Sequence, residues 1–267
     1  MKILIIGKGS VGNTLAQFHP DDALAYHDPK IGEYALTTTA YDVAHITYPM
    51  TDLLVWVHTT QEYIKGFPKV KWWMIHSTIL PEALDYLPNN ILIVYSPIRA
   101  TEAIMDSMVA QYRKFWAVVN RKTFKQTPEQ WIQMREYIQT HFPDPLEFTN
   151  AKTLALGKLL ETADFGMQIA FAQMVADMCG YEDNMQAFDE AYREYRRYSE
   201  YGADYQDIQD GAPMEWIPRG LFTPNVIGGK CVMQNLKLVH DAGLGDRALW
   251  QWICDSNERQ KRRELHG

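Results

Sequence analysis

Short apolar runs alternate with polar or helical stretches through the first half of the chain. Most of these runs are four or five residues long and apolar almost throughout, which is typical of strands buried on both faces of a parallel sheet. Segments in which apolar residues have helical spacing lie between some of these runs. Examples are Pro81–Leu87 and Pro128–His141, the second of which has Thr127 as its N-cap. The alternation predicts an α/β fold with an open parallel sheet covered by helices. The expected strands are Lys2–Ile6, Ala23–His27, Leu53–Val57, Trp72–His76, Ile91–Tyr95, Phe115–Val119 and Leu146–Phe148.

The second half of the chain has a helical pattern instead. Apolar residues recur at helical spacing through Ala151–Met178, which predicts one long helix with a wide apolar face. Gly180 is expected to end it, and Asn184 to cap a second helix with a charged outer face. A proline- and glycine-rich loop and two shorter helices should follow, at Gly202–Lys230, Val232–Asp241 and Asp246–Arg263. We therefore expect two domains, an α/β domain over residues 1–149 and an all-α domain over 150–267 built on the long helix.

Composition narrows the possible functions. The 267 residues carry a formal net charge of −7, which argues against a general nucleic-acid binder. No apolar stretch is long enough to span a membrane, and the apolar N-terminal run is too short for a signal peptide. The three cysteines, Cys179, Cys231 and Cys254, fit neither a disulfide framework nor a zinc motif, which favours a reduced, cytoplasmic setting.

A glycine-rich turn follows the first expected strand. Gly7, Gly9 and Gly12 have the spacing that allows a tight turn and a close approach of a pyrophosphate to a helix N-terminus, with Ser10 and Val11 inside the turn. An acidic residue, Asp28, ends the next strand, where a carboxylate can accept hydrogen bonds from the adenosine ribose. This context predicts a Rossmann-like domain that binds NAD in preference to NADP. A similar turn that binds no nucleotide is the alternative.

Further short motifs resemble those of the UDP-glucose/GDP-mannose dehydrogenase family. They occur in the family's order and span nearly the whole chain, and the last is the most specific. Val57–Thr60 resembles the loop that ends in threonine after the family's fourth strand. Four other segments, His76–Pro81, Tyr95–Arg99, Lys158–Thr162 and Gly228–Asn235, also match. In that order they resemble the family's Ser-Thr-Val-x-Pro, Ser-Pro-Glu-Arg, Lys-x-x-x-Asn and Gly-Gly-x-Cys-x-Pro-Lys-Asp motifs.

The resemblance implies oxidation of a sugar or sugar-nucleotide alcohol, with hydride transfer to NAD. In this reading a Cys231 thiolate traps the aldehyde as a thiohemiacetal, and Lys158 stabilises the oxyanion. Thr78, Thr162 and Asn235 complete the implied catalytic set, and Thr60 and Thr78 join the glycine turn around the cofactor. The implied substrate-binding residues are Arg99, Gly228 and Gly229, to which we add Arg219 from the long loop. Cys179 and Cys254 are read as buried apolar residues.

The departures from the family pattern keep other readings open. Ile98 replaces the glutamate implicated in water activation, Thr162 replaces an asparagine, and Gln234-Asn235 replaces a lysine–aspartate pair. The segment after Cys231 is too short for the family's second Rossmann-like domain, so we expect nucleotide recognition from elsewhere, or another substrate. A 6-phosphogluconate or 3-hydroxyacid type of dehydrogenase that uses Lys158, and a catalytically silent NAD-binding protein, are the alternatives. The resemblance also implies a homodimer through the long helix.

Overall fold

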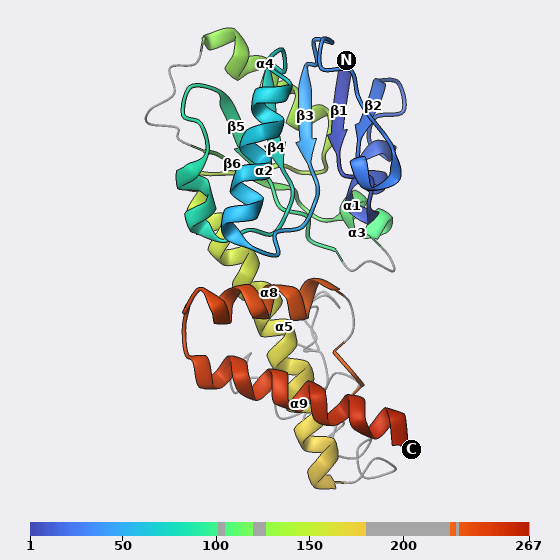
Figure 1. Cartoon of the computed structure of the whole chain (residues 1–267), viewed down its shortest axis with the longest axis vertical. Helices are drawn as coiled ribbons and strands as arrows, with labels where there is room; N and C mark the ends of the chain where they lie inside the picture. Colours follow the sequence, from blue (N-terminus) through green and yellow to red (C-terminus); the bar gives the residue numbers. More distant parts are fainter. Residues whose placement is uncertain (101–104, 120–126, 180–224, 228–229, 267) are drawn as a thin grey trace, which may run out of the picture. The chain divides into compact units, whose positions relative to one another are not determined.

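The computed structural model describes residues 1–100, 105–119, 127–179, 225–227 and 230–266 (Figure 1). The chain divides into two compact units, Met1–Glu161 and Thr162–Gly267. The division lies inside the long helix α5 (Ala151–Cys179), whereas the sequence placed a boundary at the start of that helix.

The first unit is built on a seven-stranded sheet of order β2-β1-β3-β4-β5-β6-β7. Neighbouring strands are parallel except for β5 and β6, which run antiparallel. The predicted α/β class with a parallel sheet is therefore confirmed, with one antiparallel pair that the sequence pattern did not indicate. The strands are β1 (Lys2–Ile6), β2 (Ala23–His27), β3 (Val43–Ile46), β4 (Trp72–Ile75), β5 (Leu92–Tyr95), β6 (Phe115–Val118) and β7 (Leu146–Phe148).

Helices cover both faces of this sheet. Alternate residues of a strand point to opposite faces, so Ile3 and Ile5 share one core cluster while Leu4 and Ile6 face the other way. The first cluster also takes residues from α1 (Ser10–Gln17), α3 (Met105–Gln111) and α4 (Pro128–His141). Figure 1 shows α2 (Leu53–Gly66) lying across the front of the sheet. Because both faces are covered, most strand residues are fully buried.

One predicted strand is wrong. Leu53–Val57 begins helix α2, and the strand of this region is Val43–Ile46, which the sequence reading missed. Asp52 caps the helix, with its side chain accepting a hydrogen bond from the backbone N–H of Val55 at 2.9 Å. A short apolar run fits a helix and a buried strand equally well, so the cap residue was the better signal.

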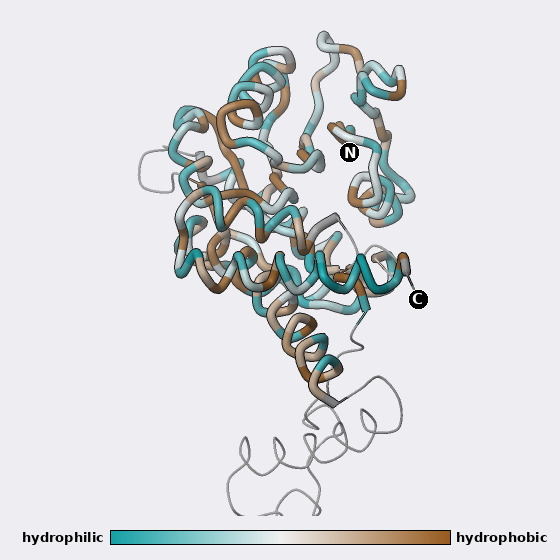
Figure 2. Tube along the Cα trace, turned by 60° about the horizontal axis from the view of Figure 1, so that its bottom comes forward, coloured by the Kyte–Doolittle hydropathy of each residue, from teal (hydrophilic) through white to brown (hydrophobic). Residues whose placement is uncertain are grey.

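The helices of the second unit pack against the C-terminal part of α5. A Cβ atom at Gly166 of α5 would lie 3.0 Å from Val232 and 3.1 Å from Leu236, which brings helix α8 (Lys230–Asp241) very close. Helix α9 (Arg247–His266) adds Ser256, whose hydroxyl donates to Gln173 at 2.7 Å. Figure 2 shows α9 becoming increasingly hydrophilic toward the C-terminus. Among the described residues, no helix combines the length and apolar character needed to cross a membrane.

Candidate functional site at the C-terminal edge of the sheet

The candidate residues of the first unit collect where the parallel strands end. The glycine turn follows β1, Asp28 follows β2, Thr47 follows β3, and His76 follows β4. The chain passes from β1 to β2 on one side and then crosses from β2 to β3 on the other side of β1, so the crevice between β1 and β3 is the switch point at which open α/β sheets bind ligands. The arrowheads of β1 and β3 point to this edge in Figure 1.

Each of the three glycines occupies its position in the turn for a different physical reason. Gly7 has φ +98°, which an L-residue rarely adopts, and Gly12 packs so tightly that a Cβ there would lie 2.1 Å from the Gly7 carbonyl oxygen. Gly9 has ordinary extended backbone and caps helix α1, and a Cβ there would meet nothing within 4 Å. The fold therefore requires Gly7 and Gly12, whereas the open space at Gly9 leaves room for a pyrophosphate beside the N-terminus of α1.

Asp28 lies beside this turn, as the sequence predicted for a ribose-binding carboxylate. Its Oδ2 accepts a hydrogen bond from the Lys8 backbone N–H at 2.8 Å, and its Oδ1 accepts one from the Lys30 N–H at 3.1 Å. These bonds fix the carboxylate, and its oxygens have lone pairs to spare for ribose hydroxyls. The Lys8 ammonium is held by Glu33 at 2.9 Å, and this hydrogen bond raises the pKa of Lys8. The turn and Asp28 therefore fit a dinucleotide.

The structure near the ends of β3 and β4 corrects the predicted setting of Thr60. Val57–Thr60 is not a loop after a strand, because it lies inside helix α2, where the buried Thr60 hydroxyl pairs with the Tyr48 hydroxyl at 2.5 Å. The residue that follows a strand here is Thr47, whose hydroxyl lies 2.7 Å from the Gly7 carbonyl oxygen. The missed strand β3 hid this threonine from sequence reasoning.

The segment after β4 keeps the position expected for it. The Ser77 hydroxyl donates to the Tyr48 carbonyl at 2.6 Å, which ties the ends of β4 and β3 together. Ser77 is buried, whereas the neighbouring Thr78 is half-buried. Thr78 thus lies on the edge that also holds the glycine turn.

An ion-pair cluster joins the end of β5 to helix α5. Glu161 lies 2.9 Å from Arg99 Nη2 and 3.2 Å from Lys158 Nζ. Burial opposes ionisation of Glu161, but Lys158 and Arg99 outweigh it and lower the pKa of this carboxyl group. The sequence reading found Arg99 and Lys158 but missed Glu161, although the spacing of three residues from Lys158 on a helix was the available signal.

A buried lysine adjoins this cluster. Lys114 is 5% exposed, and its ammonium nitrogen lies 2.9 Å from the Ser96 carbonyl oxygen and 3.3 Å from Pro97 O. Burial, and secondarily the charge of Lys158, holds the pKa of Lys114 well below its usual range. Buried lysines of this kind occur at catalytic sites, and no local pattern in the sequence distinguishes this one from the others.

Other implied site residues belong to the second unit or lie outside the described residues. Asn235 is buried on α8, and Thr162 is buried on α5 one turn after Lys158. The backbone of Cys231 lies in the first turn of α8, so the loop setting expected for it is wrong. Gly228, Gly229 and Arg219 lie outside the described residues, as do Gly180, the helix capped by Asn184, and most of the loop Gly202–Lys230.

Ile98, which stands where the resembled family has a glutamate, packs in the core of the first unit. Its side chain is 8% exposed and belongs to the core cluster, with Met105 and Val109 of α3 in the same cluster. A carboxylate there would need a partner that this apolar cluster lacks.

Comparison with solved structures places the fold among dehydrogenases. The chain matches a UDP-D-ManNAc dehydrogenase from Pyrococcus horikoshii with a TM-score of 0.68 at 16% identity, over 97% of this chain and 69% of that one. It matches the UDP-N-acetyl-mannosamine dehydrogenase Cap5O from Staphylococcus aureus with a TM-score of 0.64 at 16% identity, over 100% and 69%. The chain shares their fold. A 3-hydroxyisobutyrate dehydrogenase from Mycobacterium tuberculosis also matches, with a TM-score of 0.53 at 11% identity over 99% and 94%.

Comparison with protein-family models and with curated protein sequences found no match. The likeness to solved structures supports the fold that the resemblance implied. The chain spans 69% of the length of each of the two sugar-nucleotide dehydrogenases.

Proposed function

We propose that the chain is an NAD-dependent dehydrogenase that oxidises the CH–OH group of a sugar or sugar nucleotide. The glycine turn carries this proposal, because it combines an open position at Gly9 with the N-terminus of α1 and with Asp28 on the next strand end. Backbone N–H groups around Ser10 and Val11 would bind the pyrophosphate, and Asp28 would accept hydrogen bonds from the ribose. When bound, NAD supplies a hydride acceptor.

The proposed chemistry assigns the remaining residues. Lys158 stabilises the alkoxide and the oxyanion, and Thr78, Thr162 and Asn235 supply hydrogen bonds. Loss of a proton and a hydride would convert the alcohol to the aldehyde, and the Cys231 thiolate would add to the aldehyde carbon. A second hydride would leave the thiohemiacetal for a second NAD molecule, and attack of water on the resulting thioester would release the acid and return the thiol. Because Ile98 replaces a carboxylate, we expect the hydrolysis to be slow. The proposed substrate contacts are Arg99, Arg219, Gly228 and Gly229.

A 3-hydroxyacid type of dehydrogenase is the second candidate. Two observations favour it: the likeness to the 3-hydroxyisobutyrate dehydrogenase extends over 94% of that chain, and Lys158 lies beside Glu161 and Arg99 at the strand ends. In this reaction Lys158 takes the proton of the alcohol as hydride leaves, and no cysteine takes part.

Adding a methyl group at Gly9 tests the cofactor site. We expect Gly9→Ala to keep the unfolding midpoint, because the added Cβ meets no neighbour, and to weaken NAD binding in calorimetry at least tenfold. Gly66→Ala is the matched control, since its Cβ also meets nothing within 4 Å, and it should bind NAD normally. In the same titration Asp28→Ala should narrow the gap between NAD and NADP. Equal NAD binding by wild type and Gly9→Ala would contradict the proposal.

Two further variants separate the candidate reactions. With a panel of sugar nucleotides, sugar phosphates and hydroxyacids, Lys158→Met should lower NAD reduction at least a hundredfold under either mechanism, in line with the loss of one charge-stabilising or acid–base group. Cys231→Ala should do the same only under the thiolate mechanism, and Cys254→Ala serves as the control cysteine. Full activity of Cys231→Ala would favour the hydroxyacid type, and NAD binding with no turnover on any substrate would favour a silent protein.

The homodimer stays a prediction. Leu156 and Leu160 of α5 are 37% and 46% exposed and lie one helical turn apart. A second copy of the helix would cover them.

A further inference from the structure

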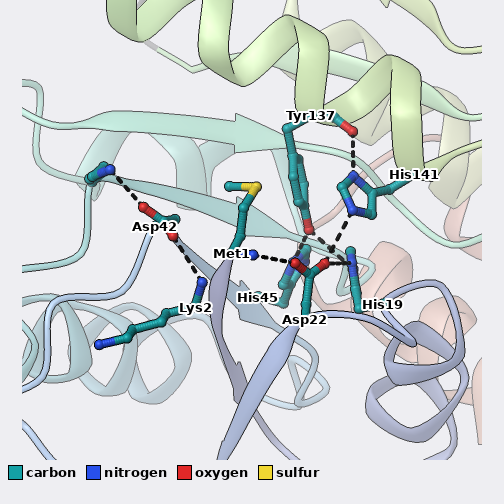
Figure 3. Close-up of polar contacts among 9 residues, drawn as sticks. Met1, Lys2, His19, Asp22, Asp42, His45, Tyr137 and His141 are labelled. Carbon is teal, nitrogen blue, oxygen red and sulfur yellow. Dashed lines mark hydrogen bonds and ion pairs between the residues drawn. The ribbon is translucent and has the colours of Figure 1, made fainter.

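A chain of buried polar side chains crosses the core of the first unit and belongs to neither proposed reaction. It begins at His76 after β4, passes through His45 of β3 and Tyr137 of α4, and ends at His19 (Figure 3 shows its last part). His19 follows α1, Asp22 precedes β2, and His141 is the last residue of α4. This end of the chain therefore lies at the N-terminal edge of the sheet, opposite the glycine turn.

Hydrogen bonds link these groups into one chain. His76 Nδ1 lies 2.9 Å from the Ser96 carbonyl oxygen and 3.3 Å from Lys114 Nζ, and His76 Nε2 lies 2.8 Å from His45 Nδ1. His45 Nε2 lies 2.6 Å from the Tyr137 hydroxyl, which in turn lies 3.1 Å from His19 Nε2. When His76 Nδ1 donates to Ser96, each group accepts from the next one along the chain, and His19 Nδ1 carries a lone pair.

His141 also has a ring nitrogen with a lone pair, and its own hydrogen bond shows this independently of His76. Its Nδ1 lies 2.9 Å from the Tyr137 carbonyl oxygen and must donate to it, so the Nε2 atom of the neutral ring carries a lone pair. Both free ring nitrogens face one carboxylate oxygen: Asp22 Oδ2 lies 3.3 Å from His19 Nδ1 and 3.2 Å from His141 Nε2. In the tautomer that leaves His19 Nδ1 with a lone pair, three acceptors converge without a donor between them. His19 Nδ1 is fully buried and has no hydrogen-bond partner.

We propose that His19, Asp22 and His141 bind a divalent transition-metal cation of the zinc class. The three donor atoms all lie within 4.8 Å of one another, and two of the three separations match the ligand spacing of about 3.3 Å that Zn²⁺ bonds of 2.0–2.1 Å give in a tetrahedron. Two imidazoles and one carboxylate are a ligand set that zinc accepts and that Mg²⁺ and Ca²⁺ disfavour. A water molecule would complete the coordination.

The surroundings of the three ligands fit the same assignment. Each histidine has a protein oxygen within hydrogen-bond distance of its other ring nitrogen, as metal-binding histidines normally do. Burial, the largest effect, lowers the pKa of His19 to about 4 and so keeps the ring neutral at physiological pH. The Asp22 and His141 side chains are 11% and 16% exposed, so an ion can enter from that side. Asp22 Oδ1 is turned away to the Met1 amine, which leaves Oδ2 for the cation.

A bound ion would join the connection between α1 and β2 to the end of α4. Since these segments are far apart in the sequence, we expect the cation to stabilise the fold of the first unit.

Zinc titration of the full chain, purified without a histidine tag and treated with a chelator, tests the site. Calorimetry and elemental analysis should show one Zn²⁺ per chain at micromolar concentration, a raised unfolding midpoint, and no response to Mg²⁺. Asp22→Asn and His141→Ala should each weaken Zn²⁺ binding more than tenfold, since even supporting residues cost about 10–100-fold. His58→Ala, which removes an exposed histidine of α2, is the matched control and should bind like wild type.

Two outcomes would overturn the proposal. If the wild-type chain binds no Zn²⁺, the proposal is wrong whatever the variants show, because a proton then occupies the place between the three acceptor atoms. If folded Asp22→Asn and His141→Ala still bind Zn²⁺ like wild type, the proposal is also wrong, because the ion then binds elsewhere. Circular dichroism shows which variants are folded, and His141→Asn provides a smaller polar replacement at a partly exposed position if His141→Ala is not.

Discussion

Gly12→Ala should destabilise the protein by about 3 kcal/mol or more, the upper range for overpacking a tight contact. The added Cβ would lie 2.1 Å from the Gly7 carbonyl oxygen and 3.2 Å from Thr47 Oγ1. The nearest obstacle is backbone, so no side chain can turn aside. Helix α1 must move away from β1, and the contacts of Leu15 with the core must loosen. Urea unfolding followed by circular dichroism measures the effect.

Gly9→Ala is the control for this prediction because the same change is made three residues away in the same turn. Its free energy of unfolding should stay within about 0.5 kcal/mol of wild type, since the site is open and the backbone there is ordinary. The pair thus separates two roles of glycine, close packing at Gly12 and room for a ligand at Gly9. If Gly12→Ala were as stable as Gly9→Ala, the close packing of α1 on the turn would be wrong.

The strands that sequence reasoning placed correctly share a clear local signal. Lys2–Ile6 and the run that begins at Trp72 are nearly continuous apolar segments bounded by glycine or polar residues, and both are strands. Val43–Ile46 lacked this signal because it is short and contains His45, which reads as a polar interruption. His45 is nevertheless fully buried, since His76 and Tyr137 satisfy both of its ring nitrogens. Those partners lie far along the chain, beyond any local pattern.

The candidate site likewise contains residues that the sequence predicts and residues that it does not. The glycine turn and Asp28 could be predicted because one strand–turn–helix unit and the next strand contain the whole motif. Glu161, Lys114 and the metal-ligand set could not be predicted so readily, because strand order and helix packing bring their partners together. The antiparallel pairing of β5 with β6 is another such feature. Nothing in the apolar run of β6 indicates its direction.

Acid should destabilise the protein through His76, in the pH range just below the ordinary histidine pKa. Burial, and secondarily the nearby charges of Lys114 and His45, hold the pKa of His76 well below 6.5. Between that lowered pKa and about 6.5, the unfolded chain binds a proton at this residue and the folded chain does not. Stability therefore falls as the pH falls, by about 1.4 kcal/mol per pH unit for this one proton, and is fully restored above about pH 6.5.

The variant His76→Gln tests this assignment, because an amide can still form hydrogen bonds with Ser96 O and His45 but cannot take up a proton. It should lose some stability at neutral pH, about 1–3 kcal/mol for an imperfectly paired polar group. Its free energy of unfolding should depend on pH less steeply than that of wild type between pH 6 and 5, by about one proton. His58→Gln, at an exposed position on α2, should keep the wild-type slope. Urea unfolding at a series of pH values measures all three proteins, and identical slopes for wild type and His76→Gln would show that His76 takes up its proton in the folded state as readily as in the unfolded chain.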